Sequence, residues 1–175
     1  MTWPILLTVL SLLTILTYTL CVCIEIHGIP ASLSVTFFRI RHPLRFQLTL
    51  VATAGLLLPG LIAAGAPHTS GLVMSASSGM MLIALAPNFR KPRQEIIHVI
   101  GAVMSLVSSQ VWMVLNMDVC LWLWAVCVSA ILVAMLFQKR KSLLQRFLGT
   151  RPLFWIEITS LGTTYASVLW RLIKL

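Results

Sequence analysis

Six long apolar runs, separated by short connections that carry most of the charge, constrain this chain more than any other feature. The runs cover residues 3–24, 48–64, 70–86, 96–115, 119–137 and 153–173. A helix of about 20 apolar residues crosses a hydrocarbon core about 30 Å thick. Two of the runs, 48–64 and 70–86, are close to the lower limit for such a helix, so the sequence predicts five or six membrane crossings.

The composition agrees with a membrane environment. Hydrophobic residues make up 59% of the chain and charged residues 10%, whereas soluble domains are about half apolar and about a quarter charged. A soluble domain of this length could not bury so much apolar surface. We therefore predict an all-α integral membrane protein, built as one domain from a single bundle of about six transmembrane helices.

Basic residues are concentrated on alternate connections. Of the 13 Lys and Arg residues, 11 follow the first, third and fifth runs, and the other two are Arg171 and Lys174. If each run crosses the membrane once, these three connections lie on one side. Because basic connections stay in the cytoplasm, we expect a multi-pass protein of the cell membrane whose N- and C-termini are both non-cytoplasmic.

Two of the basic connections also contain many apolar residues. Residues 33–46 interleave phenylalanine and leucine with three arginines, and residues 142–149 repeat this pattern around Arg146. Apolar residues beside arginines are typical of helices that lie in the headgroup region, which predicts short interfacial helices on the cytoplasmic side. The alternative is that both segments extend the adjacent spans, with long basic side chains reaching toward the interface.

The last apolar run carries a polar stripe. Glu157, Ser160, Thr164, Ser167 and Arg171 recur at steps of three and four, which places them on one face of a helix. Since such a face is unfavourable in hydrocarbon, it should line the bundle interior, a cavity or a partner protein. Glu157 is near the start of the run, so pairing with a loop arginine close to the headgroups is the alternative for this residue.

The fourth run has a face that combines polar and small residues, among them His98 and Ser105. Gly101, Ser105 and Ser109 place a small residue at every fourth position, and the third run repeats this spacing at Ser75 and Gly79. Small residues at this spacing let two helix backbones approach closely. We expect tight packing between these two runs, with a substrate or cofactor site as the alternative.

A further group of polar and ionisable residues is expected at the cytoplasmic rim, where the predicted topology places Glu25, His27, Asn88, Glu95, His98 and Glu157. Histidine and glutamate together can bind a metal or act as a general base on a lipid headgroup. Their spacing, however, matches no metal-binding or nucleophile motif. We predict no metal site and no cofactor, and a polar interface without chemistry is the favoured interpretation.

Three short motifs follow one another in the first two thirds of the chain. They are Gly28-Ile-Pro-Ala-Ser-Leu-Ser-Val-Thr-Phe-Phe38, Ala84-Leu-Ala-Pro-Asn-Phe89, and His98 followed by Ser108-Ser-Gln-Val-Trp112. Their order, over residues 20–115, resembles a set of uncharacterised small polytopic membrane proteins encoded by bacteria and their phages. The resemblance implies no activity. It implies that certain positions are fixed by structure or function, namely Pro30, Ser32, Ser34, Pro87, His98 and Trp112.

These features leave three hypotheses for function. The favoured one is a non-enzymatic bundle that packs against the lipid bilayer, a membrane partner protein or a second copy of itself, because small and hydroxyl residues are abundant and ionisable residues are few. The second is a small transporter or channel that uses Glu157 and the polar face of the last run. The third is a membrane enzyme acting on lipid headgroups at the His/Glu rim. Nucleic acid is excluded as a partner because no extended basic face exists.

Overall fold

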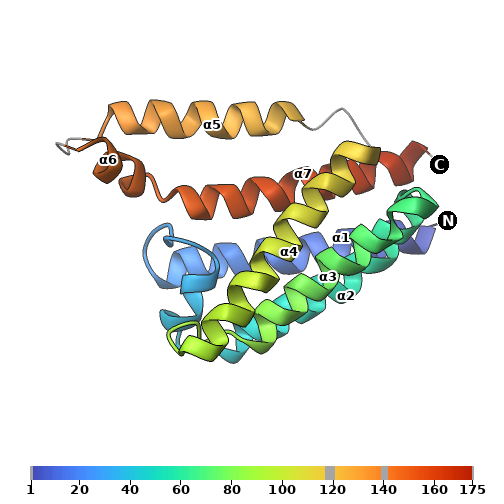
Figure 1. The fold of residues 1–175 in the computed structure, drawn as a ribbon, viewed down its shortest axis with the longest axis horizontal. Coiled ribbons are helices and arrows are strands. Elements are labelled where there is room, and N and C mark those ends of the chain that lie inside the picture. Colours follow the sequence, from blue (N-terminus) through green and yellow to red (C-terminus); the bar gives the residue numbers. More distant parts are fainter. Residues whose placement is uncertain (1, 117–120, 139–141, 175) are drawn as a thin grey trace.

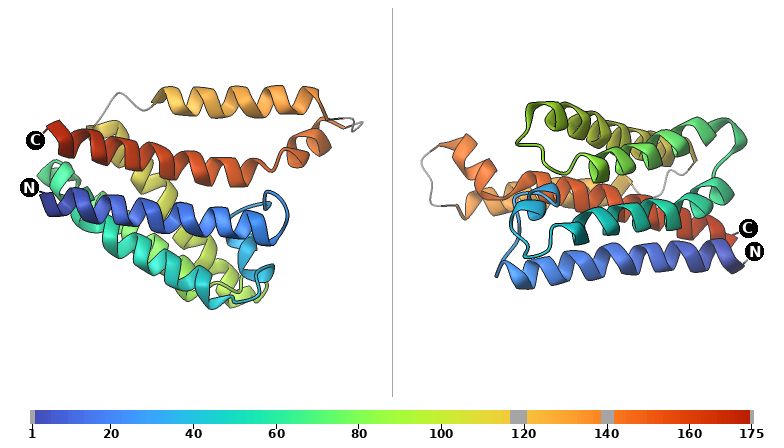
Figure 2. Two further views of the ribbon diagram at one scale, coloured as in Figure 1. Left: turned by 180° about the vertical axis from the view of Figure 1, so that it is seen from behind. Right: turned by 90° about the horizontal axis from the view of Figure 1, so that it is seen from below.

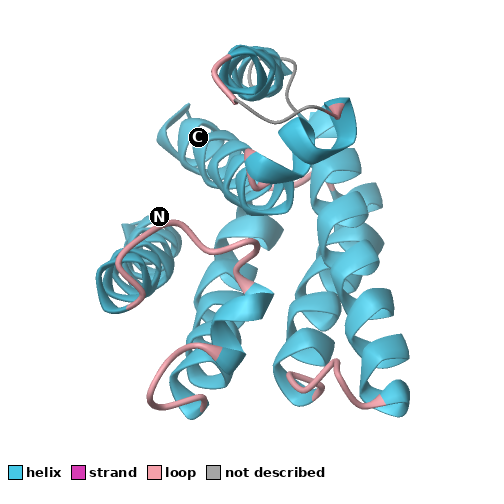
Figure 3. Cartoon of the chain, turned by 90° about the vertical axis from the view of Figure 1, so that its left-hand side faces the viewer, coloured by secondary structure: helices cyan, strands magenta, loops and turns pink. Residues whose placement is uncertain are grey.

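Every regular element in the described part of the chain is helical, as predicted. The computed structural model describes residues 2–116, 121–138 and 142–174, and Figure 3 shows helices and loops alone in these ranges. Residues 119 and 120, the predicted start of the fifth run, lie outside them. The α-helices and two 3-10 helices are α1 (Thr2–Glu25), η1 (Ser34–Phe38), α2 (Leu44–Ala64), η2 (Pro67–Thr69), α3 (Ser70–Leu85), α4 (Pro92–Asn116), α5 (Leu121–Leu136), α6 (Leu143–Gly149) and α7 (Pro152–Lys174).

The long helices run alternately in opposite directions (Figure 1). The N- and C-terminal ends of the chain and the turn between α2 and α3 lie at one end of the bundle. The connection between α1 and α2 (residues 26–43), the connection between α3 and α4 (residues 86–91) and α6 lie at the other end. The described parts of the three basic connections therefore share one end of the molecule.

Three helices, α1, α2 and α4, are each long and apolar enough to cross a membrane. Helices α3 and α5 have 16 residues each, or about 24 Å at about 1.5 Å per residue, which is shorter than the hydrocarbon core. Helix α7 has 23 residues but contains the polar stripe. The chain is thus all-helical with three candidate spans, and the predicted bundle of six spans is not confirmed.

Helix α7 lies at the centre of the bundle. It contacts α1, α2, α4 and α5, while α1, α2, α3 and α4 pack against one another in chain order. Helix α5 lies at the periphery, where its main neighbours are α6 and α7 (Figures 1 and 2). The stripe on α7 accordingly faces protein, with Ser160, Thr164 and Ser167 all buried.

Helices α3 and α4 meet through the small residues that the sequence indicates. The Ser108 hydroxyl donates a hydrogen bond to Ser75 Oγ at 2.8 Å. A Cβ atom added to Gly79 would lie 2.5 Å from the backbone nitrogen of Ser105, and one added to Gly101 would lie 2.7 Å from the carbonyl oxygen of Gly79. No side chain fits at these distances, so the two backbones are in direct contact.

Helices α1, α2 and α7 meet around Gly60, the residue after Pro59 within α2. A Cβ atom added to Gly60 would lie 2.1 Å from Thr8 Oγ1 and 3.2 Å from Val168 Cγ1, so glycine is required for this three-helix contact. One turn further along α1, the Ser11 hydroxyl donates to the carbonyl oxygen of Thr53 and lies 2.5 Å from Tyr165 Oη. Because the single Ser11 proton is directed at the carbonyl, Tyr165 is the donor in the second hydrogen bond.

The connection between α1 and α2 differs from the interfacial helix expected over residues 33–46. It forms the short helix η1, and α2 begins at Leu44. Thr36 is completely buried, and its hydroxyl lies 2.5 Å from Tyr18 Oη. Leu33 and Ile40 are also buried, because the apolar side chains of this segment turn into the end of the bundle. Residues 142–149 do form a helix, α6, whose leucines are exposed.

Candidate functional site

Two carboxylates from different helices bind the connection between α1 and α2. Glu25, the last residue of α1, accepts a hydrogen bond from the backbone N–H of Arg41 at 2.7 Å. Glu157, in the second turn of α7, accepts one from the backbone N–H of Leu33 at 2.5 Å. The segment has little regular structure, so its N–H groups need side-chain acceptors. Both carboxylates therefore hold this segment in place.

His98 binds the same connection from α4. Its Nδ1 lies 3.0 Å from the carbonyl oxygen of Ala86, so this nitrogen carries the proton. In the neutral ring Nε2 then accepts a hydrogen bond from the Ser34 hydroxyl, also at 3.0 Å. The ring is 6% exposed and packs against Phe89 at 4.8 Å between centroids. Neither nitrogen is free to take a proton from a substrate, and His98 joins residues of all three sequence motifs.

The structure thus brings three of the expected rim residues, Glu25, His98 and Glu157, to one segment of chain, where each binds separately. Glu25 also lies 3.9 Å from the Arg45 guanidinium. His27 is exposed and has a φ of 53°, in the left-handed region where α1 ends, and no contact links it to the others. Glu157 forms no ion pair with any described residue; its hydrogen-bond donor is a backbone amide and not the loop arginine considered above.

A cleft of about 310 Å³ lies beside Glu157, between α2, α3, α4 and α7. Its walls are mostly apolar, with leucines from α2, Met80 from α3 and valines from α4. Polar groups are contributed mainly by α7 and α4. They are Glu157, Ser160 and Thr164 on α7, Ser105 and Ser109 on α4, Ser77 on α3, and Ser34 beside Leu33 in the connection between α1 and α2.

The cleft reaches the outer surface of the bundle. Helix α4 crosses α7 near the C-terminal ends of both helices and diverges from it toward the other end (Figure 1). Val103 on α4 and Leu153 on α7 both line the cleft, and they are 56% and 61% exposed. The opening therefore lies on the apolar side surface of the molecule, between the diverging parts of these two helices.

Gln110 binds two hydroxyl groups of the cleft lining, those of Ser160 and Thr164, where α4 packs against α7. Its side-chain amide donates to Ser160 Oγ at 2.8 Å. Its side-chain carbonyl accepts hydrogen bonds from Trp124 Nε1 at 2.9 Å and from the Thr163 hydroxyl at 3.0 Å. One amide thereby connects α4, α5 and α7. The sequence reasoning missed Gln110 as a site residue, although an amide within an apolar run is itself a signal for helix–helix hydrogen bonding.

The far end of the α7 stripe has a structural role. The Arg171 guanidinium donates to the carbonyl oxygen of Asn116 at 2.8 Å and to Asn116 Oδ1 at 3.2 Å. Asn116 Oδ1 also accepts from the backbone N–H of Ala66 at 2.9 Å. Ser167 is fully buried, and its hydroxyl has no partner within the described residues. The stripe therefore divides into Glu157 at the cleft, a central part bonded to Gln110, and Arg171 at the opposite end of the bundle.

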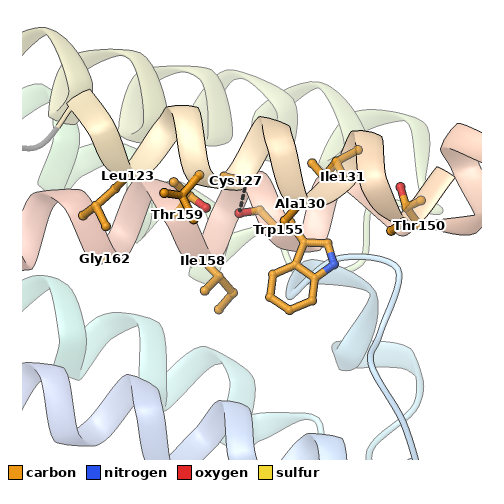
Figure 4. Close-up of a pocket in the computed structure, with 11 residues that line it drawn as sticks. Leu123, Cys127, Ala130, Ile131, Thr150, Trp155, Ile158, Thr159 and Gly162 are labelled. Atoms are coloured by element: carbon orange, nitrogen blue, oxygen red, sulfur yellow. Dashed lines mark hydrogen bonds between the residues drawn. The ribbon is translucent and has the colours of Figure 1, made fainter. Parts of the chain in front are cut away.

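A second groove, of about 360 Å³, lies between α5 and α7 (Figure 4). Helix α5 contributes Leu123, Cys127 and Ile131, among others, and the Cys127 thiol lies 3.8 Å from the carbonyl oxygen of Trp155. The Thr150 hydroxyl at one end is already bonded to the carbonyl oxygen of Phe147. The groove offers apolar contact without a charged group to orient a ligand.

Within the described ranges, no group of three His, Cys, Asp or Glu side chains is placed to hold a metal ion. Comparisons of the chain with models of known protein families, with curated proteins and with solved structures find no match.

Proposed function

We propose that this chain is a multi-pass protein of the cell membrane that binds a membrane amphiphile in the cleft between α2, α3, α4 and α7, without catalysing a reaction. In this proposal α1, α2, α3, α4, α5 and α7 each cross the bilayer once. The basic connections then lie in the cytoplasm, and both termini lie on the other side.

The surface along the long helices supports a membrane location, because many of its exposed side chains are large and apolar. The polar face of α7, in contrast, is buried. Large hydrophobic side chains are exposed along all the long helices, for example Leu20 on α1, Ile62 on α2 and Leu132 on α5. Soluble monomers rarely expose such continuous apolar surface. The alternating helix directions and the gathering of basic connections at one end support six crossings.

The observation that carries the functional proposal is the shape and lining of the cleft. A volume of about 310 Å³ is at the small end of the range for ligand pockets, about 300–1,000 Å³. The apolar walls suit an alkyl chain, and Glu157 with the nearby hydroxyl groups suits a polar head. Since the opening beside Val103 and Leu153 faces the hydrocarbon in the proposed orientation, an amphiphile can enter from the bilayer.

A small transporter is the second candidate. Pro59 lies within α2 between Leu57 and Leu61, which both line the cleft. A proline removes one backbone hydrogen bond and is a common bending point in a helix. The headgroup enzyme has less support, because both nitrogens of His98 are engaged and Glu25 and Glu157 each bind a separate backbone N–H.

Photo-crosslinking tests the proposed binding. The protein is reconstituted in phosphatidylcholine nanodiscs that contain a phospholipid with a diazirine on one acyl chain, and labelled residues are mapped by mass spectrometry. Outward residues such as Leu13 will be labelled by surrounding lipid. We expect label also on the buried cleft residues Leu50 and Met80. Label restricted to outward residues would show that no acyl chain enters the cleft.

A matched pair of variants makes the test specific. Ala102→Phe places a large side chain in the cleft, whereas Ala63→Phe places the same side chain on the exposed surface of α2. We expect Ala102→Phe to remove most of the label from Leu50 and Met80 and Ala63→Phe to leave it in place. Equal labelling of these residues in both variants would contradict the proposal.

A further inference from the structure

We infer that Glu157 determines the specificity of the cleft and that the amphiphile bound there carries a positively charged head. This inference names the ligand class of the cleft and therefore rests on the proposed function.

Glu157 is the one ionisable side chain among the described residues that line the cleft. None of the described basic residues of the three connections contributes to its walls, and no described residue forms an ion pair with Glu157. A carboxylate surrounded by apolar side chains interacts strongly with an opposite charge, because the local dielectric constant is low. A cationic head would supply that charge, whereas an anionic head would be repelled.

The hydrogen bonds of Glu157 leave one oxygen available. Oε2 accepts the backbone N–H of Leu33, which fixes the orientation of the carboxylate in the wall of the cleft. Oε1 has no partner among the described residues. Fixing one oxygen and leaving the other open pre-organises a carboxylate for binding, since little side-chain freedom remains to be lost.

The neighbouring Ser34 hydroxyl also favours a cation. It directs its proton at His98 Nε2 in the neutral ring. Ser34 therefore presents oxygen lone pairs toward the end of the cleft. Together with Oε1 of Glu157 it forms a surface of acceptors, which suits an ammonium or quaternary amine rather than a phosphate or carboxylate head.

Three probes with the same twelve-carbon chain separate charge from chain binding: dodecyltrimethylammonium, the uncharged dodecyldimethylamine oxide, and dodecanoate. Each is added below its micelle concentration to the protein in phosphatidylcholine nanodiscs, and displacement of the diazirine label from Leu50 and Met80 is measured. We expect the cation to displace the label at a concentration about tenfold lower than the amine oxide, and dodecanoate to be the weakest.

Variants of Glu157 and of a control position test whether the preference for the cation over the amine oxide depends on Glu157. Glu157→Gln should equalise the cation and the amine oxide, because its amide can still accept the Leu33 N–H but carries no charge. Glu95→Gln removes the same charge from an exposed position on α4 outside the cleft and should keep the wild-type preference. If Glu157→Gln does not fold, Val103→Lys places a positive charge at the opening and should weaken cation binding about tenfold while Glu157 stays in place.

The measurements distinguish failure of the cationic-ligand inference from failure of the proposed lipid binding. Equal displacement by the cation and the amine oxide in the wild type, or a preference that survives both Glu157→Gln and Val103→Lys, would overturn the cationic ligand while leaving a lipid-binding cleft. If none of the three probes displaces the label, and Ala102→Phe does not remove it, both the cleft ligand and the proposed function are wrong.

Discussion

The carboxylate of Glu157 and the backbone amide of Leu33 are joined by a hydrogen bond of 2.5 Å, although they are 124 positions apart in the chain. Both residues line the cleft. The same contact thus positions the connection between α1 and α2 and orients the charge that faces the cleft. Changes at Glu157 should alter both stability and ligand preference, and the choice of substituent separates the two effects.

Replacement of Glu157 by glutamine and by leucine should have different effects on stability. Glutamine retains an acceptor for the Leu33 N–H, whereas leucine leaves this buried donor without a partner, which costs about 1–3 kcal/mol. We expect Glu157→Leu to lower the free energy of unfolding in mixed micelles by that amount relative to Glu157→Gln. Glu95→Leu is the control at an exposed position. Equal stability of the two Glu157 variants would argue against the hydrogen bond.

His98 and Ser34 should be energetically coupled. His98→Phe keeps an aromatic ring against Phe89 and removes both hydrogen bonds, and Ser34→Ala removes the hydroxyl. In a double-mutant cycle, side-chain hydrogen bonds between helices in membrane proteins contribute on average about 0.6 kcal/mol and at most about 1.7 kcal/mol. We expect a coupling in this range from chemical unfolding. A control cycle that combines His68→Phe with Ser34→Ala should give no coupling energy, because His68 is exposed.

Two glycine substitutions should have opposite effects on stability, because Gly79 lies in the contact between α3 and α4 whereas Gly55 on α2 has open space around it. Gly79→Ala would force a methyl group against the Ser105 backbone and should destabilise the protein by about 1–3 kcal/mol. Gly55→Ala meets nothing within 4 Å and should stabilise α2 by about 0.5–1 kcal/mol, because alanine is the better helix former. Thermal unfolding of both variants in detergent measures the difference, and a shift in the same direction for both would be inconsistent with close backbone contact.

The proposed topology predicts that a C-terminal alkaline phosphatase fusion is active and a C-terminal fluorescent protein fusion is dark, because both reporters would be outside the cytoplasm. A fusion after Gln138, which removes α6 and α7, should give the opposite pair of results. An inactive phosphatase on the full-length chain would place the C-terminus in the cytoplasm and contradict the proposed topology.

The helices and the inward polar face of α7 could be predicted because both depend on local periodicity. Ser160, Thr164 and Ser167 repeat at helical spacing, and a polar face avoids hydrocarbon wherever the helix is placed. The close approach of α3 and α4 was predictable for the same reason, since the small residues Gly79 and Gly101 have a recognisable spacing.

The other features of the site depend on how the helices cross, and local sequence patterns do not determine the crossing positions. The partners of Gln110 are set by the position at which α4 crosses α7. The pattern of residues 33–46 is equally suitable for a segment that lies on lipid and for one that packs into protein, because both environments take the apolar side chains and leave the arginines outside. Sequence reasoning placed Glu25, His98 and Glu157 at one end, but it could not show that each binds the backbone or side chain of the same connection.

The central position of α7 has a consequence for how the protein is made. A ribosome synthesises α7 after the six other α-helices, yet Tyr165 and the Gln110-bonded hydroxyls on this helix satisfy polar groups on α1 and α4. In the proposed membrane orientation, those groups would face lipid or one another until α7 is present. Assembly of the bundle is therefore completed by insertion of a late helix between early ones, and a chain arrested before Pro152 would present a distinctive exposed polar surface to the cell's quality-control proteases.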